Sequence, residues 1–294
     1  MKIQRGSLLT EGKTKRVFLT EGQDNMVICE YKDTITAHND PSLTREFEGK
    51  GADSNTVNCR VFKLLNQVGI PTAFVEQLSP NEFLALKCRM VPLEVVARRY
   101  LVGSYLKRCP DIAKGTRCPY LLIEFFLKTT AGKLVTEDSR VLLSGLTPEQ
   151  DDPLIANPFD PNWQLIHPKL PTWHEDSELG NIMASTVIVM SSMIVPKAMQ
   201  KMENTIRQVF LTIENAWNTL GLRLVDLKIE FGITPDGRLI VADVIDLDSW
   251  RLWRPTKEGE WEDVSKQSFR DGDELETVRA KYALVAKLAQ QLDV

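Results

Sequence analysis

Two carboxylates near the end of the chain are placed to face one another. In LVDLKIEFG, apolar residues alternate with Asp226, Lys228 and Glu230, so a strand here buries one face and presents three charged groups on the other. A second strand-like run, LIVADVI, follows through Asp236-Gly237. This dipeptide favours a two-residue hairpin turn, because both turn positions need a positive φ. With these turn residues, Glu230 lies directly opposite Asp243.

Because Glu230 and Asp243 are expected to face one another, a cation is needed to compensate the repulsion between their charges. Directly opposed like charges destabilise a sheet. Carboxylate oxygens suit Mg²⁺, which takes one or two protein carboxylates and leaves its other positions to water and to substrate phosphates. The alternative is a solvated hairpin whose carboxylates diverge into water. The pattern alone leaves both interpretations open.

A glycine-containing hairpin is expected over residues 11–18, EGKTKRVF. The residues at its tip are Gly12, Lys13, Thr14 and Lys15. Their backbone amides and ammonium groups could cover a polyphosphate, although the segment is not a Walker A loop. The alternative is a solvated tip, which is the more frequent fate of a lysine-rich turn. Gly49 and Gly51, on either side of Lys50, mark a second close approach of the backbone.

The segment VPLEVVARRYLVGSYLKR offers a second anion site. Its β-branched residues predict a strand on which Glu94 and Arg98 share one face, whereas in a helix the two would form an i,i+4 ion pair. Gly103-Ser104 then opens a short helix. Free amides and a hydroxyl at that point favour a phosphate, and Arg98 adds positive charge.

The composition narrows the class of protein. A chain of 294 residues with 43% hydrophobic and 26% charged residues buries a sizeable core, in two lobes or one large domain. A net charge of −4 argues against nucleic acid as the main partner. The longest nearly apolar run, 182–195, is too short to cross a bilayer, so no membrane partner is expected. Five cysteines without a CxxC motif fit a reducing, cytoplasmic environment.

Strands and amphipathic helices together predict an α+β fold. We expect a β-rich lobe over 1–88, whose hairpin tip could bind a polyphosphate, and an α+β lobe over 89–294 that carries the carboxylate pair and the second anion site. The proline-rich stretch 129–178 is interpreted as an irregular surface insertion. Strands are expected over 26–31, 72–76, 83–87 and 121–128. Apolar spacings of three and four predict helices over 57–68, 199–220 and 275–292.

Several motifs in a fixed order resemble one family, the phosphoribosylaminoimidazole-succinocarboxamide (SAICAR) synthetases. They are EGKTKRVF, KDTITA, EGKG, MVPLEVVARRYLVGSYLKR, LVDLKIEFG, ADVIDLDSWRLW and SKQSFRD, and they span nearly the whole chain. The wording ADVIDLDSWRLW looks more like that of the animal-type enzymes, without the carboxylase domain that animal forms carry.

The resemblance implies a two-lobed SAICAR synthetase-like fold with ATP between the lobes. It implies a ligase of de novo purine biosynthesis that joins L-aspartate to carboxyaminoimidazole ribonucleotide, cleaving ATP to ADP and phosphate through an acyl phosphate. Mg²⁺ is expected with ATP, and whether the chain forms a homo-oligomer is left open.

The resemblance also implies roles for individual residues. The expected ATP-binding residues are Gly12, Lys13, Thr14, Lys15, Lys87 and Met90. The expected substrate-binding residues are Glu94, Arg98, Ser104, Lys50, Asn55, Arg251 and Arg270. The expected catalytic residues are Lys228, Asp226 and Arg251. The expected Mg²⁺ ligands are Glu230, Asp243 and Asp248.

Some positions depart from the family pattern. His38 stands where bacterial members commonly have Phe and animal-type members glycine, and Arg254 replaces an acidic residue. Either Asp152-Pro153 or Asp160-Pro161 matches the family's Asp-Pro element. Two alternatives remain: another ATP-dependent ligase or small-molecule kinase, and a non-catalytic nucleotide-binding relative.

Overall fold

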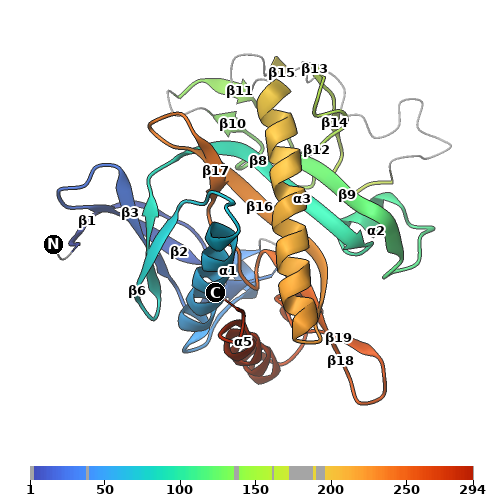
Figure 1. Cartoon of the computed structure of the whole chain (residues 1–294). Helices are drawn as coiled ribbons and strands as arrows, with labels where there is room; N and C mark the ends of the chain where they lie inside the picture. Colours follow the sequence, from blue (N-terminus) through green and yellow to red (C-terminus); the bar gives the residue numbers. More distant parts are fainter. Residues whose placement is uncertain are drawn as a thin grey trace. The chain divides into compact units, whose positions relative to one another are not determined.

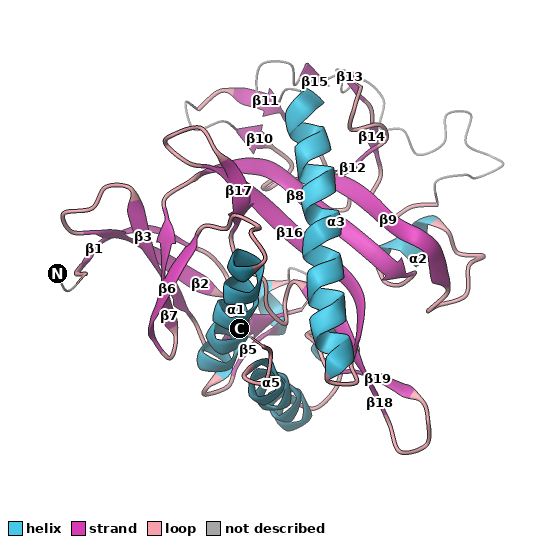
Figure 2. Cartoon of the chain, viewed as in Figure 1, coloured by secondary structure: helices cyan, strands magenta, loops and turns pink. Residues whose placement is uncertain are grey.

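The computed structural model describes residues 3–37, 40–135, 139–160, 162–171, 188–189 and 196–293. It contains both helices and β-sheets (Figure 1, Figure 2), which confirms the predicted α+β class. The chain divides into two compact units, the first formed by Met1–Met90 with Val209–Val294 and the second by Val91–Gln208. Within the described ranges, no helix combines the length and apolar character needed to cross a membrane.

This division differs from the predicted lobes 1–88 and 89–294. The C-terminal segment belongs with the first 90 residues because the two make direct contacts. Ala73 N donates to Val241 O at 2.8 Å, and Val241 N donates to Pro71 O at 3.0 Å. Helix α1 (Lys50–Gln67) also packs against helix α5 (Leu275–Ala289). That ATP lies between the predicted lobes stays a prediction.

The N-terminal sheet of the first unit is antiparallel, in the order β1-β2-β3-β7-β6. Its strands are β1 (Arg5–Glu11), β2 (Lys15–Thr20), β3 (Met26–Tyr31), β7 (Glu82–Leu86) and β6 (Phe74–Ser79). Helix α1 packs against it, with Phe62 stacked on Phe74 at 5.9 Å between ring centroids. The connecting pair is β4 (Thr34–Thr36) and β5 (Thr44–Glu46), with the 3₁₀ turn η1 (Pro41–Leu43) between them. Strand β1, the β4–β5 pair and η1 lie outside the predicted elements.

The C-terminal part of the first unit carries the hairpins that position the predicted metal ligands. Strand β16 (Arg223–Ile233) pairs along its first half with β18 (Trp250–Pro255) and along its second half with β17 (Leu239–Ala242). Strand β18 pairs in turn with β19 (Trp261–Asp263). The short helix α4 (Gln267–Arg270) and helix α5 follow.

Helix α3 (Pro196–Thr219) confirms the predicted long amphipathic helix (Figure 1). Its buried stripe comprises Met199, Met202, Ile206, Phe210, Ile213 and Trp217. The indole of Trp217 meets that of Trp250 edge-on at 5.7 Å. The helix ends before Gly221, whose φ of +75° favours glycine.

The second unit is built on the long antiparallel pair of β8 (Arg89–Tyr100) and β9 (Arg117–Leu127). The short strands β12 (Leu154–Ile155) and β14 (Leu165–Ile166) extend this sheet beyond β9. Two further ladders join β10 (Leu134–Val135) with β11 (Val141–Leu143), and β13 (Asn162–Trp163) with β15 (Ile188–Val189). Helix α2 (Ser104–Arg108) lies between β8 and β9 in the sequence.

The interpretation of 129–178 as an irregular surface insertion is wrong for its described part. Its strands β12 and β14 continue the sheet. The segment also contributes to the core, where Trp163 is 2% exposed and Leu165 fully buried. The proline-rich sequence concealed these strands because each is only two or three residues long, too short for a periodicity to appear. Residues 172–178 lie outside the described part.

Candidate functional site

The glycine hairpin near the N-terminus has the predicted connectivity. Gly12 N donates to Lys15 O at 2.9 Å and closes the turn between β1 and β2. Two further bonds fix the tip: Thr34 Oγ1 to Lys13 O at 2.6 Å, and Lys32 N to Thr14 O at 2.7 Å. The backbone of the tip is therefore held by the segment that follows β3.

The β16–β17 hairpin is shifted by one residue from the predicted register. Glu230 faces Ala242, not Asp243. The loop has three residues, Pro235-Asp236-Gly237, of which the last has a φ of +82° and donates its N–H to Thr234 O at 2.8 Å. A three-residue loop with glycine in the left-handed region is the next most common hairpin connection after the two-residue turns. Asp243 lies beyond the end of β17 with a φ of +63°, so it does not continue the strand alternation.

Both predicted carboxylates have lysine partners in the same unit. Glu230, 3% exposed, accepts a hydrogen bond from Lys228 Nζ at 2.9 Å. Asp243 forms an ion pair with Lys15. A carboxylate as buried as Glu230 does not diverge into water, which excludes the solvated-hairpin alternative for that residue. The structure thus brings a predicted ATP-binding lysine, Lys15, to a predicted metal ligand.

Asp226 and Arg251, predicted to be catalytic, form a cross-strand pair. Arg251 Nη1 donates to Asp226 Oδ2 at 2.6 Å, and its backbone N donates to Oδ1 at 3.2 Å. Arg251 Nε donates to Gln267 Oε1 at 3.1 Å. Burial, with a smaller effect from the charge of Arg251, lowers the pKa of Arg270. Two arginines so close together form a positive region that favours an anion.

Asp248 is surrounded by donors in a way that does not support its assignment as a metal ligand. Tyr282 Oη donates to Oδ1 at 2.7 Å, and Lys266 Nζ donates to Oδ2 at 2.8 Å. Lys50 Nζ lies 3.7 Å from Oδ2. Burial acts to raise the pKa of Asp248, but the charges of Lys50 and Lys266 outweigh it and hold that pKa well below its usual value. The side chain therefore joins α5 and the segment before α4 to the loop that follows β17.

Lys50 and Asn55, two of the predicted substrate-binding residues, are fully buried. The Asn55 amide donates to the carbonyl oxygens of Ser79, Pro80 and Glu82 at 3.1, 3.0 and 3.2 Å. It therefore shapes the turn between β6 and β7. Direct substrate contact by either residue stays a prediction, and neither side chain exposes surface in this structure.

Lys87 and Met90, predicted to lie by the adenine, flank the junction of β7 and β8. Lys87 N donates to Asn25 O at 2.8 Å. Met90 is 41% exposed, which is unusual for a methionine and leaves its side chain able to pack on a planar ligand. Their role at the nucleotide stays a prediction.

Arg98 and Ser104 meet in the second unit as predicted. Residues 94–98 are in strand β8, so the helical i,i+4 pair of Glu94 with Arg98 is excluded. Arg98 Nη2 donates to Ser104 Oγ at 3.3 Å. Its Nε donates to Glu124 Oε2 at 2.6 Å.

Glu124 and Arg108 form a buried network with the predicted site residue Arg98, and the sequence reasoning missed both. Arg108 donates from Nη2 to Glu124 Oε1, and from Nη1 to Pro168 O at 3.2 Å. The available signal was the single carboxylate in the apolar strand LLIEFFLK. A charge at a strand position with buried neighbours needs a partner.

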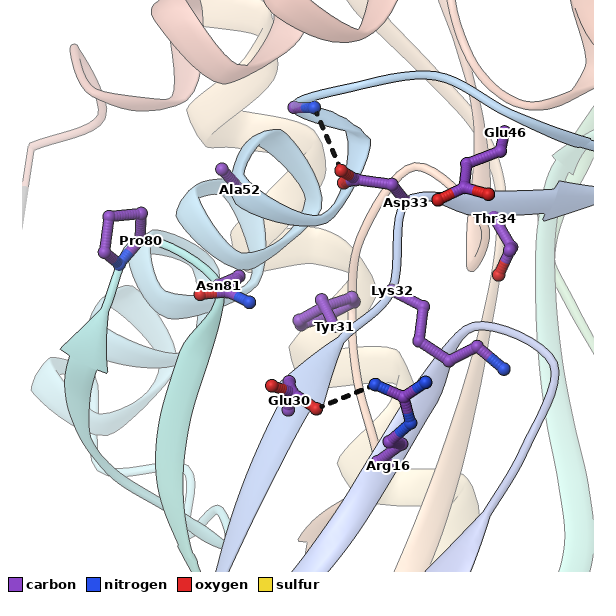
Figure 3. Close-up of a pocket in the computed structure, with 11 residues that line it drawn as sticks. Arg16, Glu30, Tyr31, Lys32, Asp33, Thr34, Glu46, Ala52, Pro80 and Asn81 are labelled. Carbon is purple, nitrogen blue, oxygen red and sulfur yellow. Dashed lines mark hydrogen bonds and ion pairs between the residues drawn. The ribbon is translucent and has the colours of Figure 1, made fainter.

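A cavity of about 430 Å³ in the first unit contains none of the predicted site residues. Figure 3 shows its charged lining, in which Arg16 pairs with Glu30 at 3.3 Å and Asp33 accepts the Gly49 N–H at 3.3 Å. Asp33 also accepts the Gly51 N–H at 2.8 Å and so caps the start of α1. These contacts account for the charges of Arg16, Glu30 and Asp33 without a ligand.

The donor set fits Mg²⁺ at Glu230 and Asp243, although no group of three or more His, Cys, Asp or Glu side chains occurs among the described residues. Magnesium is normally held by one or two carboxylates together with phosphates and water. Asp243 keeps 24% of its side chain exposed, and its present partner is itself a cation. Asp243 therefore keeps surface through which it can reach a metal ion.

The chain is similar to known proteins of one family. The family model described as SAICAR synthetase matches residues 8–154 and 162–288. A phosphoribosylaminoimidazole-succinocarboxamide synthase of Chloroflexus aurantiacus is 39% identical over 291 residues, which are 97% of each chain. A bifunctional phosphoribosylaminoimidazole carboxylase/phosphoribosylaminoimidazole succinocarboxamide synthetase of Drosophila melanogaster is 33% identical over 96% of this chain but 57% of its own length.

Solved structures give the same result. A structure described as SAICAR synthetase (Type-2) in complex with ADP aligns with a TM-score of 0.72 and 26% identity, covering 97% of this chain and 98% of the other. The Type-1 SAICAR synthetase structure from Pyrococcus horikoshii OT3 has a TM-score of 0.69 and 26% identity, covering 94% and 97%.

Proposed function

We propose the following roles from the premise that this chain belongs to the SAICAR synthetase family. The chain is an ATP-dependent carbon–nitrogen ligase of purine biosynthesis, which joins L-aspartate to carboxyaminoimidazole ribonucleotide to give SAICAR, ADP and phosphate. The observation that carries this function is the family match over 8–154 and 162–288. The motifs from which we expected the family lie within those ranges.

The nucleotide is proposed to bind at the β1–β2 hairpin. Gly12, Lys13 and Thr14 would offer backbone amides, and Lys15 an ammonium group, to the phosphates. The contact of Lys15 with Asp243 supports this, because a lysine held beside a metal-type carboxylate is near the place where metal and phosphate charges meet. Lys87 and Met90 are proposed to lie beside the adenine.

Mg²⁺ is proposed to be held by Glu230 and Asp243. When bound, it would neutralise charge on the phosphate oxygens during phosphoryl transfer. Lys228 orients Glu230 through its 2.9 Å hydrogen bond. Asp248 is left out of this set, because its oxygens already accept bonds from Tyr282 and Lys266.

A phosphate site for the ribonucleotide is proposed in the second unit. Arg98 and Ser104 would take its 5′-phosphate, with Glu94 on the same strand at the imidazole. For the first unit, Arg251 and Arg270 stay predicted substrate-binding residues. Asp226 holds Arg251 at 2.6 Å and so fixes the direction of its guanidinium.

The reaction is proposed to proceed through an acyl phosphate. A carboxylate oxygen of the ribonucleotide attacks the γ-phosphorus of ATP, and the bond from that phosphorus to the bridging oxygen breaks to release ADP. The aspartate amine then attacks the acyl carbon, phosphate leaves with its bonding electron pair, and the nitrogen loses a proton. Lys228 and Arg251 would stabilise the charge that develops on oxygen.

An ADP-release assay with each substrate omitted in turn tests this function. Release is expected only when ATP, the ribonucleotide and aspartate are all present. Release without aspartate would indicate a kinase of the ribonucleotide, and no release with nucleotide binding retained would indicate a non-catalytic relative.

A second assay follows ADP release against Mg²⁺ concentration for Asp243→Asn, which should require much more metal. An unchanged requirement would remove Asp243 from the metal set.

The location of the reaction and its assembly are also proposals. All five cysteines are free thiols, which fits the reducing conditions of the cytoplasm, where we place the enzyme. A homo-oligomer stays a prediction, to be checked by measuring the mass of the protein in solution.

A further inference from the structure

Three charged side chains in the second unit form one buried group. Arg98 Nε donates to Glu124 Oε2 at 2.6 Å, and Arg108 Nη2 donates to Glu124 Oε1. Arg98 and Arg108 are each 3% exposed and Glu124 is 8% exposed. Nothing assigned so far uses Arg108 or Glu124.

The strand register places Glu124 where it can hold Arg98. Val96 lies opposite Glu124, and Arg98 lies opposite Leu122, so Glu124 and Arg98 are diagonal neighbours on one face of the β8–β9 pair. Glu124 binds Arg98 at Nε. The guanidinium is planar, so fixing that edge directs Nη2 toward Ser104 Oγ, 3.3 Å away.

Arg108 holds the carboxylate from its other side. It lies at the end of α2 and is itself fixed by the bond to Pro168 O at 3.2 Å. Its guanidinium carbon lies 5.5 Å from the ring centroids of Tyr105 and Phe126. The carboxylate, and through it Arg98, therefore has little freedom to turn.

The group has two positive charges and one negative charge, and burial makes this costly. A buried ion network often contributes less stability than apolar residues of the same volume would. The fork geometry of arginine nevertheless provides a direction that an apolar group cannot provide. A net positive charge that points at a hydroxyl is the arrangement that a phosphate dianion requires.

We propose that Glu124 and Arg108 are positioning residues for the 5′-phosphate of the ribonucleotide. They act through Arg98: Glu124 fixes its Nε edge and Arg108 fixes Glu124, so that Nη2 and Ser104 Oγ are presented together. This inference rests on the proposed function and extends it to two residues that would not touch the substrate.

Glu124→Gln separates orientation from charge. The amide keeps the volume of the side chain but replaces one acceptor oxygen by an NH₂ donor. That NH₂ then faces the N–H donors of one of the two guanidinium groups and cannot form a hydrogen bond with them. The net charge of the group rises from +1 to +2. If charge alone mattered, the ribonucleotide would bind more tightly. If orientation matters, its KM should rise about 10- to 100-fold, because a charge-assisted bond to phosphate is lost or misdirected. The KM values for ATP and aspartate should stay unchanged.

Two further variants complete the experiment. Glu203→Gln is the matched control, since it removes a carboxylate from another arginine pair of the same unit, Arg207 with Glu203 at 2.5 Å, and should leave every KM unchanged. Arg108→Lys serves if Glu124→Gln does not fold: it keeps the charge but loses the fork, and should raise the ribonucleotide KM at least several-fold. Folding of each variant is checked by circular dichroism at the assay temperature.

The outcomes are distinct from those of the proposed function. Wild-type protein that releases no ADP with all three substrates would refute the function itself. Suppose instead that the wild-type protein is active. An unchanged or lower ribonucleotide KM in folded Glu124→Gln would then refute the positioning role, and the same result in Arg108→Lys would refute it where that variant is needed. A lower melting temperature with unchanged KM values would show that the three residues only stabilise the fold.

Discussion

Asp248 in the first unit and Asp152 in the second are largely buried aspartates with opposite surroundings. Around Asp248, the Lys266 ammonium and the Tyr282 hydroxyl donate hydrogen bonds and Lys50 adds charge, which together hold the pKa well below its usual value. Around Asp152, burial raises the pKa to about 6, with further contributions from Glu94 and Asp151.

The backbone differs as well. Asp152 has a φ of +55°, in the left-handed region that non-glycine residues rarely adopt, and it accepts the Thr129 N–H at 2.9 Å. A carboxylate held among cations stabilises the fold in its ionised form. A carboxylate held beside other carboxylates, on strained backbone, costs stability in that form, and such positions are frequent at functional sites.

The largest expected effect is that of Asp248→Asn. It removes the negative charge between Lys50 and Lys266, so we expect a loss of about 3 kcal/mol in the free energy of unfolding at pH 7, measured by urea denaturation. The folded pKa of Asp248 lies below its unfolded value of 3.8. The stabilisation is therefore fully present above pH 3.8 and is lost progressively as the pH falls from there toward the folded pKa. The difference between wild type and variant should therefore shrink below pH 4. A constant difference from pH 7 to pH 3 would contradict the assignment.

Asp152→Asn should have a smaller effect of the opposite sign. The folded pKa of about 6 exceeds the unfolded 3.8, so ionisation of Asp152 lowers stability as the pH rises through 6. Asparagine has no charge and tolerates positive φ well. We expect the variant to gain about 1–2 kcal/mol at pH 8 and to lose that gain below pH 4. Denaturation at both pH values checks this, and a variant less stable than wild type at pH 8 would show that the carboxylate is stabilising.

The smallest expected effect is that of Lys50→Met. Lys50 Nζ has no hydrogen-bond partner among the described residues and lies 3.7 Å from Asp248, which keeps Lys266 and Tyr282. Replacing a buried ammonium by an apolar chain of similar length should change stability by less than about 1 kcal/mol. The KM values for all three substrates should be unchanged. A selective rise in one of them would restore Lys50 as a substrate contact.

Elements with a clear period could be predicted from the sequence. The strand Met26–Tyr31 occurs with the expected bounds, and α3 and α5 occur where predicted. Helix α1 buries Val57, Phe62 and Leu65 as expected but starts earlier, at Lys50, and leaves Val68 outside it and exposed. The β16–β17 register was wrong by one residue, because Asp-Gly fits both the two-residue turn and the last two positions of a three-residue loop. Local sequence does not decide between them.

The candidate site was predictable where chemistry and local spacing coincide, as for Arg98 with Ser104. It was not predictable where distant segments decide the environment. The burial of Lys50 and Asn55 depends on α5 and on the β6–β7 turn, and the pairing of Arg98 with Glu124 depends on strand register. His38, named as a departure from the family pattern, lies outside the described residues.

The first unit is assembled from both ends of the sequence, which has a consequence for synthesis on the ribosome. Helix α1 packs on α5, and residues 71–73 bond to β17, so the first 90 residues emerge long before their partners. At about 5–20 residues per second, α5 follows roughly 10 to 40 s later. The second unit is continuous in sequence and can complete its own contacts within that interval. A nascent chain therefore leaves the side of α1 that packs on α5 uncovered while the second unit is already folding, and a chaperone has most access to that side then.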